Sequence, residues 1–395
     1  MMFLVGLAAA TQVQAVQALA PLLVARAGLS YAQIGVLTGL FMLPGVFLAM
    51  PGGMLAARVG DRRTMAIALA LMLASALLFA ASGSYAVMVV ARLIGGGGAA
   101  VLTTQGLKVV TDWFAGREIS TAMAINAASF GLGVGVATGL LAGIGAVSSW
   151  QAAMLANAAL TGTALAMVLA IYRDPPAGIG ASPGVPVRPK GHGLQLDRRE
   201  FVLALLASAM RMWFSSGYLL FMSFAPVLLI SRGTGVAQAG FLVSLSAVVA
   251  LGSVPVGGFL TDRTRKPNAF ITAGALGAAL SCFMLPQAGP ALPWILLFGL
   301  LRGGCTGGIM ALPAEVLRPG SRNAGFAMSS TVYFLGLSTL PPLAGWILDA
   351  THDPAVPLWF AMGMWLMIPV TLIGFRVLQR LWTPPQEHGA SATRE

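Results

Sequence analysis

Hydrophobic side chains run along this chain in long stretches that short polar segments separate. Twelve stretches fit, at approximately 3–25, 34–57, 64–83, 86–109, 119–144, 151–172, 201–230, 238–260, 269–287, 292–314, 324–348 and 357–379. Most hold about 20 residues or more, the length that an α-helix needs to cross a ~30 Å hydrocarbon core. A membrane β-barrel would show short segments of alternating apolar and polar residues instead. The pattern predicts an all-α membrane protein with twelve transmembrane helices.

The composition agrees with this prediction. The chain has 395 residues, of which 57% are hydrophobic and 9% are charged, whereas soluble domains carry about 25% charged residues. The first apolar stretch has no positively charged segment before it and continues to about Val24, which is longer than the core of a secretory signal peptide. We therefore interpret it as a retained first helix.

One long polar interruption divides the chain. Residues 173–200 are rich in Pro and Gly and have no apolar periodicity, a composition typical of a flexible linker. The expected organisation is a six-helix bundle over 1–172, a cytoplasmic linker over 173–200, a second six-helix bundle over 201–380 and a cytoplasmic tail over 381–395.

The distribution of positive charge indicates orientation rather than a nucleic-acid partner. The net charge is +11, with 23 Lys and Arg. Three of these (Arg92, Arg211 and Arg302) lie within apolar stretches and two (Arg26 and Arg232) in loops on one side. All the others lie on the other side, so the positive-inside rule places the linker and both termini in the cytoplasm. Anionic membrane lipids are the expected contact of this basic surface.

Several classes of chemistry have no support in the sequence. Cys282 and Cys305 both fall in apolar stretches, so no disulfide framework is expected. The histidines lie in loops or tails without metal-ligand spacing, and there is no GxxxxGK[ST] nucleotide motif. We expect neither an enzyme nor a cofactor.

The two halves of the chain repeat. Arg92 in RLIGGGGAA has a counterpart in Arg302, which lies 210 positions later in RGGCTGG. The loop GMLAARVGDRR, which begins at Gly53, has a counterpart in GFLTDRTRK, which begins at Gly258, 205 positions later. Two repeats of six helices around a linker match the parallel-repeat architecture of one large class of transporters.

GMLAARVGDRR resembles the signature loop of the major facilitator superfamily, and RLIGGGGAA resembles its helix-4 motif. SYAQIGVLTGLFMLPGVFLAMPGG and LKVVTDWFAGREISTAMAI are similar to the bacterial cyanate and nitroimidazole porter subfamily. The resemblance implies the major facilitator fold and transport by alternating access. The gating-loop residues that it implies are Gly53, Arg58, Asp61, Arg62, Gly258, Asp262 and Arg263. Ala57 stands where the family's loop carries an aspartate.

The three intramembrane arginines are the principal candidates for substrate binding. An ionised arginine at a helix centre costs about 2.5–3.5 kcal/mol. Arg211 lies ~16 Å along its helix from Glu200, and Arg302 lies ~15 Å from its helix start, so both are near mid-membrane. No Asp or Glu occupies the core of any span, so the arginines need other partners. Guanidinium groups donate paired hydrogen bonds to carboxylates and similar anions, and an anionic substrate is therefore expected.

Each candidate also has a structural alternative. Arg92 is part of the helix-4 motif and could bond to carbonyl groups of neighbouring helices. The further candidate substrate-binding residues are Gln12, Gln14, Gln17, Gln105, Tyr218 and Tyr333, for which helix packing is the alternative. Glu315 and Arg318 have the spacing of an ordinary surface pair.

The sequence thus predicts a secondary transporter of a small organic or inorganic anion, monomeric and in the cell inner membrane. The absence of an Asp, Glu or His in the core of a span weakens conventional proton coupling. One alternative is an exporter of hydrophobic or drug-like compounds, since the helix-4 motif is prominent in such exporters. A second alternative is a non-transporting sensor or scaffold, although the chain has no added soluble domain.

Overall fold

A computed structural model of the protein describes residues 1–114, 119–172, 197–287, 289–317 and 322–382. Within these ranges, the side chains of residues 49–58 and of some residues between 104 and 127, at 262 and between 311 and 327 lie outside the description. Most of the expected linker (173–196) and of the expected tail (383–395) also lies outside it.

The N-terminal half contains six helical spans, two of which are divided into shorter helices. They are α1 (Met2–Ala18) with α2 (Ala20–Ala27), α3 (Tyr31–Val59), α4 (Asp61–Ala81), α5 (Tyr85–Phe114), α6 (Ile119–Val136) with the π-helix η1 (Ala137–Leu141) and α7 (Ala142–Val147), and α8 (Trp150–Ile171).

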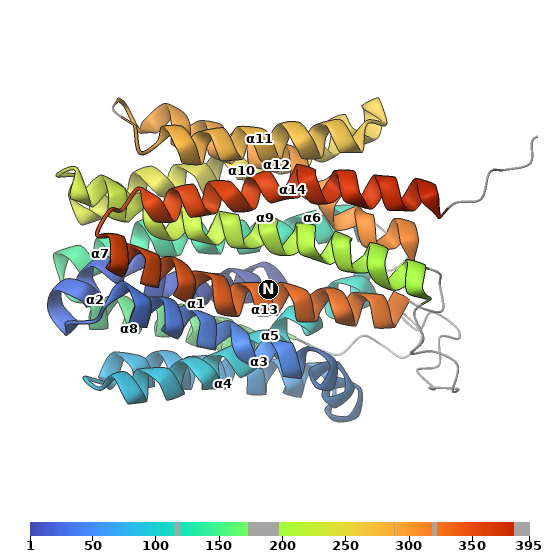
Figure 1. The fold of residues 1–395 in the computed structure, drawn as a ribbon. Helices are drawn as coiled ribbons and strands as arrows, with labels where there is room; N and C mark the ends of the chain where they lie inside the picture. The colour runs from blue at the N-terminus through green and yellow to red at the C-terminus, as the bar shows by residue number, and fades with distance from the viewer. Residues whose placement is uncertain (115–118, 173–196, 288, 318–321, 383–395) are drawn as a thin grey trace, which may run out of the picture.

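The C-terminal half contains six further helices, and the described part of the chain has no strand. The helices are α9 (Arg198–Ser231), α10 (Val236–Thr264), α11 (Pro267–Met284), α12 (Leu292–Val316), α13 (Arg322–Thr351) and α14 (Val356–Leu381). Eleven helices of the described chain are long and apolar enough to cross a membrane, or twelve when the bent pair α1–α2 counts as one span. The helices lie side by side in one bundle (Figure 1). The predicted all-α transmembrane fold is confirmed.

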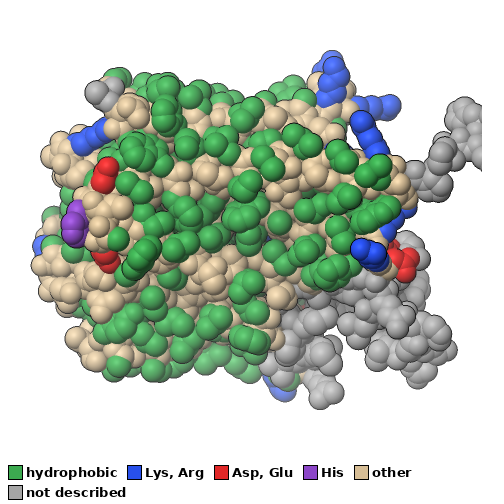
Figure 2. All heavy atoms as spheres, in the orientation of Figure 1, with side chains coloured by type: hydrophobic (Ala, Val, Ile, Leu, Met, Phe, Trp, Pro, Cys, Tyr) green, Lys and Arg blue, Asp and Glu red, His purple; other side chains and the backbone are tan. Residues whose placement is uncertain are grey.

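The bundle has two polar ends and an apolar belt. We call the end where α8 finishes at Ile171 and α9 begins at Arg198 the linker end, and the other the opposite end. Hydrophobic side chains cover the flank between them, and positive charge is concentrated at the linker end (Figure 2). The described basic residues at the linker end are Arg62, Arg63, Arg198, Arg199, Arg263, Arg265, Lys266, Arg376 and Arg380.

Two spans are interrupted in ways that the apolar pattern does not reveal. The first span bends by 47° between α1 and α2. Pro21 lies in the first turn of α2, where its missing N–H removes one bond of a continuous helix. The fifth span contains η1, a π-helical turn that widens the helix locally. Both interruptions contact other helices within the bundle.

Small residues bring the two halves into close contact. A Cβ atom added at Gly39 of α3 would lie 2.1 Å from the Ser338 carbonyl oxygen of α13. One added at Gly240 of α10 would lie 2.3 Å from the Thr138 carbonyl oxygen of η1. In lipid, helices associate through such close packing because no hydrophobic force drives them together. The inter-half contacts therefore include those of α3 with α13 and of α10 with η1.

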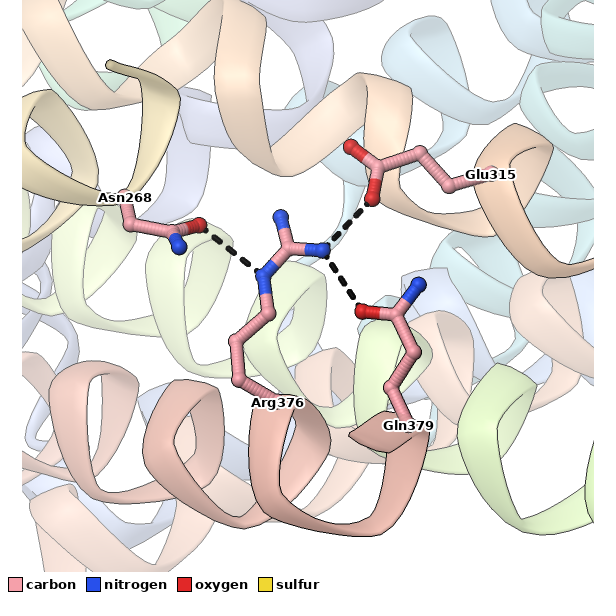
Figure 3. A network of polar contacts seen from close by, with 4 residues as sticks. All are labelled: Asn268, Glu315, Arg376 and Gln379. Carbon is pink, nitrogen blue, oxygen red and sulfur yellow. Dashed lines mark hydrogen bonds and ion pairs between the residues drawn. The ribbon is translucent and has the colours of Figure 1, made fainter. Parts of the chain in front are cut away.

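A polar network joins three helices of the C-terminal half at the linker end (Figure 3). The Arg376 guanidinium contacts the Glu315 carboxylate at 2.7 Å, and it also donates to Asn268 and Gln379 at 3.0 and 2.8 Å. Glu315 thus pairs with Arg376 of α14, whereas its expected surface partner Arg318 lies outside the described residues. Since Arg376 and Glu315 remain 23% and 36% exposed, their ion pair adds only about 0.2–1 kcal/mol.

Candidate functional site

Arg302 lies in the middle of α12 and is 7% exposed. Its guanidinium carbon is 4.0 Å from the ring centroid of Tyr218 and 5.7 Å from that of Phe214, both on α9. Its Nε has no hydrogen-bond partner among the described residues. Contact with an aromatic face stabilises a buried cation by about 0.5–2 kcal/mol, but it supplies no hydrogen-bond acceptor for the Nε–H group.

Arg211 lies on α9 and is half-buried. Its guanidinium carbon is 4.5 Å from the ring centroid of Tyr333 on α13, and its Nε also has no hydrogen-bond partner in the described part of the chain. Arg211, Phe214 and Tyr218 are spaced three and seven residues apart, so they share one face of α9. The two arginines, 91 positions apart in the sequence, therefore border the same helix face.

The rings beside Arg302 pack against one another. Tyr218 stacks on Phe298 with centroids 6.4 Å apart, and Phe214 meets Trp365 of α14 edge-on at 5.4 Å. Trp365 also meets Phe298 edge-on at 5.5 Å. These rings are buried, so they fix the position of the guanidinium group that they contact.

This part of the C-terminal half is rich in hydrogen-bond donors and poor in acceptors. We call Phe214 together with Arg211, Tyr218, Arg302 and Trp365 the Phe214 cluster. The Nε of each arginine, the Trp365 Nε1 and the Tyr218 hydroxyl have no described hydrogen-bond partner. Each Asp and Glu in a described helix lies within three residues of a helix end. The cluster is consequently electropositive and suits an anion.

Arg92 has different surroundings from its repeat mate. It is 1% exposed, and its Nε and Nη1 donate to the carbonyl oxygens of Leu37 and Gln12 at 3.0 Å. Its Nη2 donates to the Val13 carbonyl oxygen at 3.4 Å, and Phe41 lies 4.0 Å from its guanidinium carbon. Arg92 thus ties α5 to α1 and α3, which favours the structural alternative for this residue.

The helix-1 glutamines are buried at helix contacts. The Gln12 Nε2 donates to the Met72 carbonyl oxygen at 2.8 Å. The Gln14 Nε2 donates to the Ser223 hydroxyl of α9 at 3.4 Å, which joins the two halves. Gln17 Nε2 and Gln105 Oε1 have no partner among the described residues. No hydrogen bond described by the structure connects these glutamines to Arg211 or Arg302.

The gating-loop candidates lie at the linker end. Asp61 is buried as the first residue of α4, and the Arg62 guanidinium donates to the Leu169 carbonyl oxygen of α8. Arg263 is exposed near the end of α10, and Gly258 has open space where a Cβ would stand. The side chains of Arg58 and Asp262 and the surroundings of Gly53 lie outside the described residues.

Two members of the Phe214 cluster were absent from the residues that the sequence singled out. Phe214 could have been found, because it lies three residues from Arg211 and four from Tyr218 on the same helix face. Trp365 could not have been found in this way, because no charged residue lies near it on its own helix. Its neighbours in the cluster lie on α9 and α12.

Comparison with known proteins identifies the family. The family model described as Major Facilitator Superfamily matches residues 2–314. The structure is similar to that of the nucleoside transporter NupG, with a TM-score of 0.72 and 13% identity over 97% of this chain and 98% of that one. It is also similar to a bacterial homolog of the human lysosomal transporter Spinster in an inward-facing and occupied conformation, with a TM-score of 0.74 and 17% identity over 97% of each chain.

No curated protein sequence matches the chain. The family match and the structural likenesses do not single out the cyanate and nitroimidazole porter subfamily. They do cover most or nearly all of the apolar helices. The chain therefore belongs to the Major Facilitator Superfamily and is a multi-pass membrane transporter, not an enzyme.

Proposed function

We propose that this transporter moves a small organic or inorganic anion, which Arg302 and Arg211 bind near the middle of the membrane. The observation that carries the proposal is the excess of donors in the Phe214 cluster: two guanidinium groups that have no acidic partner in the described part of the chain. A bound anion would supply the missing acceptors and offset the cost of holding two cations at this depth.

The ring contacts explain how an arginine could bind an anion reversibly. Tyr218 covers one face of the Arg302 guanidinium, and this contact leaves the N–H groups at the guanidinium edge available. Two parallel N–H donors match the two oxygens of a carboxylate, and a lysine could not reproduce this geometry. The proposed substrate therefore carries a carboxylate or a group of similar shape and charge. The subfamily resemblance in the first half of the chain is compatible with such an anion.

The remaining candidates have supporting roles in this proposal. Gln14 lies where α1 meets α9 and would line the path between the halves, with Gln12, Gln17 and Gln105 as further polar positions. Arg92 would hold α5 against α1 and α3 through its carbonyl contacts. Transport would proceed as the two halves rock about the mid-membrane site and expose it to each side in turn.

Orientation follows from charge. The concentration of Lys and Arg at the linker end supports a cytoplasmic location for that end, according to the positive-inside rule. The proposal therefore places the linker and both termini in the cytoplasm and the protein in the inner membrane of a bacterial-type cell.

A thermal-shift screen of purified protein against small carboxylates and inorganic anions tests the substrate class. A ligand that binds only the folded protein raises the apparent Tm as its concentration exceeds the dissociation constant. We expect a saturable shift with at least one anion, and we expect Arg302→Ala and Arg211→Ala to lose it. Arg26→Ala is the matched control, because Arg26 lies at the opposite end, where it donates to the Ser148 carbonyl oxygen.

Two results would contradict the proposal. Stabilisation by neutral or cationic amphiphiles alone, unchanged in Arg211→Ala, would favour the exporter of drug-like compounds. An anion-induced shift that both alanine variants retain would place the anion site elsewhere in the protein.

A further inference from the structure

The start of α3 needs hydrogen-bond acceptors for its first N–H groups. The first four backbone N–H groups of any α-helix have no partner within the helix. At α3, Ser30 and Gln33 form a reciprocal cap: the Gln33 N–H donates to the Ser30 hydroxyl at 3.1 Å, and the Ser30 N–H donates to the Gln33 amide oxygen at 2.9 Å. This cap leaves the N–H groups of Tyr31 and Ala32 to be satisfied from elsewhere.

The acceptor comes from the other half of the protein. Asp349 of α13 accepts the Tyr31 N–H through Oδ1 at 3.0 Å and the Ala32 N–H through Oδ2 at 2.6 Å. Both carboxylate oxygens are therefore engaged across the boundary between the halves, at the opposite end of the bundle. In this arrangement α13 supplies the two acceptors that the cap of α3 leaves missing.

The placement of Asp349 favours an inter-half role over a local one. It lies two residues before the end of its own helix at Thr351, where the negative pole of the helix dipole disfavours a carboxylate. The positive pole at the start of α3 favours the same carboxylate. Asp349 is thus stabilised by the neighbouring half rather than by its own helix.

The backbones around this contact pack closely. A Cβ added at Gly345 would lie 2.2 Å from the Tyr31 carbonyl oxygen, and one added at Gly35 would lie 2.6 Å from the Pro341 carbonyl oxygen. Small residues on both helices therefore hold α13 near enough for the carboxylate to reach the end of α3.

Other charged side chains at this end bond within their own half. Arg26 donates to the Ser148 carbonyl oxygen at 2.9 Å, and Arg232 donates to the Leu285 carbonyl oxygen at 3.1 Å. Asp353 accepts the Ala355 N–H at 2.8 Å. Asp353 is thus a carboxylate at the same end that caps a turn of its own half, and it provides a natural control.

We propose that Asp349 is the gating residue that holds the opposite end of the transporter closed. When the halves separate at this end, the Tyr31 and Ala32 N–H groups lose their carboxylate acceptor, so the contact favours the closed arrangement. The proposal shares with the proposed function only the relative movement of the halves, and it requires no particular substrate.

Distance measurements between spin labels on the two halves test this role without any substrate. Gly83→Cys, between α4 and α5, and Thr234→Cys, between α9 and α10, place the labels at the opposite end. Protein without the added cysteines is labelled in parallel, and its signal gives the background from the buried Cys282 and Cys305. In the protein that carries both labels and keeps Asp349, we expect short distances between the two labels to dominate. Asp349→Ala should raise the ratio of long to short distances by about fivefold, the typical effect of losing a helix cap.

The control and the conservative variant make the test decisive. Asp353→Ala should leave the distance distribution unchanged. Asp349→Asn keeps one oxygen acceptor and should give an intermediate shift, and it carries the test if the alanine variant does not fold. Unchanged distances in the folded Asp349 variants, or an equal shift in Asp353→Ala, would overturn the proposal. Failure of every anion to raise the apparent Tm of the parent protein would count against the proposed function and not against the gate, because the distance measurements use no anion.

Discussion

The three arginines within the spans differ in how their donors are used. The Arg92 guanidinium donates to carbonyl oxygens of α1 and α3, whereas Arg211 and Arg302 lie against aromatic rings and the Nε of each has no hydrogen-bond partner among the described residues. Arg92 and Arg302 occupy matching positions in the two repeats, yet their neighbours differ, since Arg92 donates to backbone carbonyl oxygens and Arg302 lies against Tyr218 and Phe214. The two repeats thus carry the arginine at the same position but surround it with different contacts.

Arg92→Met separates the structural role from the substrate role. The substitution removes three buried hydrogen bonds and leaves the site poorly filled, so we expect a loss of about 2–4 kcal/mol in stability. The anion-induced rise in apparent Tm should persist, since Arg92 lies outside the Phe214 cluster. Arg302→Met should cost little stability and should abolish the anion-induced rise in apparent Tm. A thermal melt of each variant, with and without the anion, distinguishes the two patterns.

Tyr218 should position Arg302 through its ring and not through its hydroxyl. Tyr218→Phe preserves the face that lies 4.0 Å from the guanidinium carbon, so anion affinity should change little. Tyr218→Leu removes the cation–π contact and should weaken binding about three- to thirtyfold. Titration of the same anion into both variants provides the measurement, and equal losses in the two would contradict a positioning role for the ring.

The arginine positions were predictable from sequence because a charge in an apolar run is costly and rare. Their partners were not, because the rings that cover Arg302 lie more than 80 positions away on α9. The burial of Gln14 against Ser223 likewise depends on contact between the halves. Helical spacing finds residues that share a face of one helix, but it does not identify the neighbour that this face meets.

At the level of helices, span lengths were predictable and their interruptions were not. The membrane thickness requires about 20 apolar residues, so an expected span at 64–83 corresponds to α4 at Asp61–Ala81. The bend before Pro21 and the π-helix at Ala137–Leu141 leave the apolar pattern unchanged. The π-helix packs against α10, the same helix pair that brings Gly240 to the Thr138 carbonyl oxygen.

Gly240→Ala should disturb the contact between α10 and η1. Its added Cβ would stand 2.3 Å from the Thr138 carbonyl oxygen, so the helices would have to separate, and overpacking of this kind costs about 1–3 kcal/mol. Gly143→Ala is the matched control, because a Cβ there has nothing within 4 Å. Comparison of apparent Tm values checks this prediction, and equal effects of the two substitutions would contradict it.

For the whole molecule, two six-helix halves meet chiefly where α3 packs against α13 and where α10 packs against the fifth span (α6, η1 and α7), with basic residues gathered at one end (Figures 1 and 2). The repeat of 205–210 positions predicted this division, since both halves carry the same motifs. The Asp349 contact was not predictable, because a carboxylate near a helix end has the appearance of an ordinary surface charge.

Orientation can be checked with a fluorescent protein that matures only in the cytoplasm, fused after residue 395. Because most Lys and Arg lie at the linker end, we expect the fusion to fluoresce. A matched fusion at Gly83, in a loop of the opposite end, should remain dark. Fluorescence of the second fusion and not the first would reverse the assigned orientation.

Transport in proteoliposomes tests the central claim most directly. The measurement is uptake of the anion that stabilises the protein, by the parent transporter and by Arg211→Ala, Arg302→Ala and Arg302→Lys. If the two arginines bind the substrate, both alanine variants should lose nearly all saturable uptake. Arg302→Lys, which keeps the charge but not the paired donors, should retain a small part of it. Near-normal uptake by both alanine variants would contradict the account.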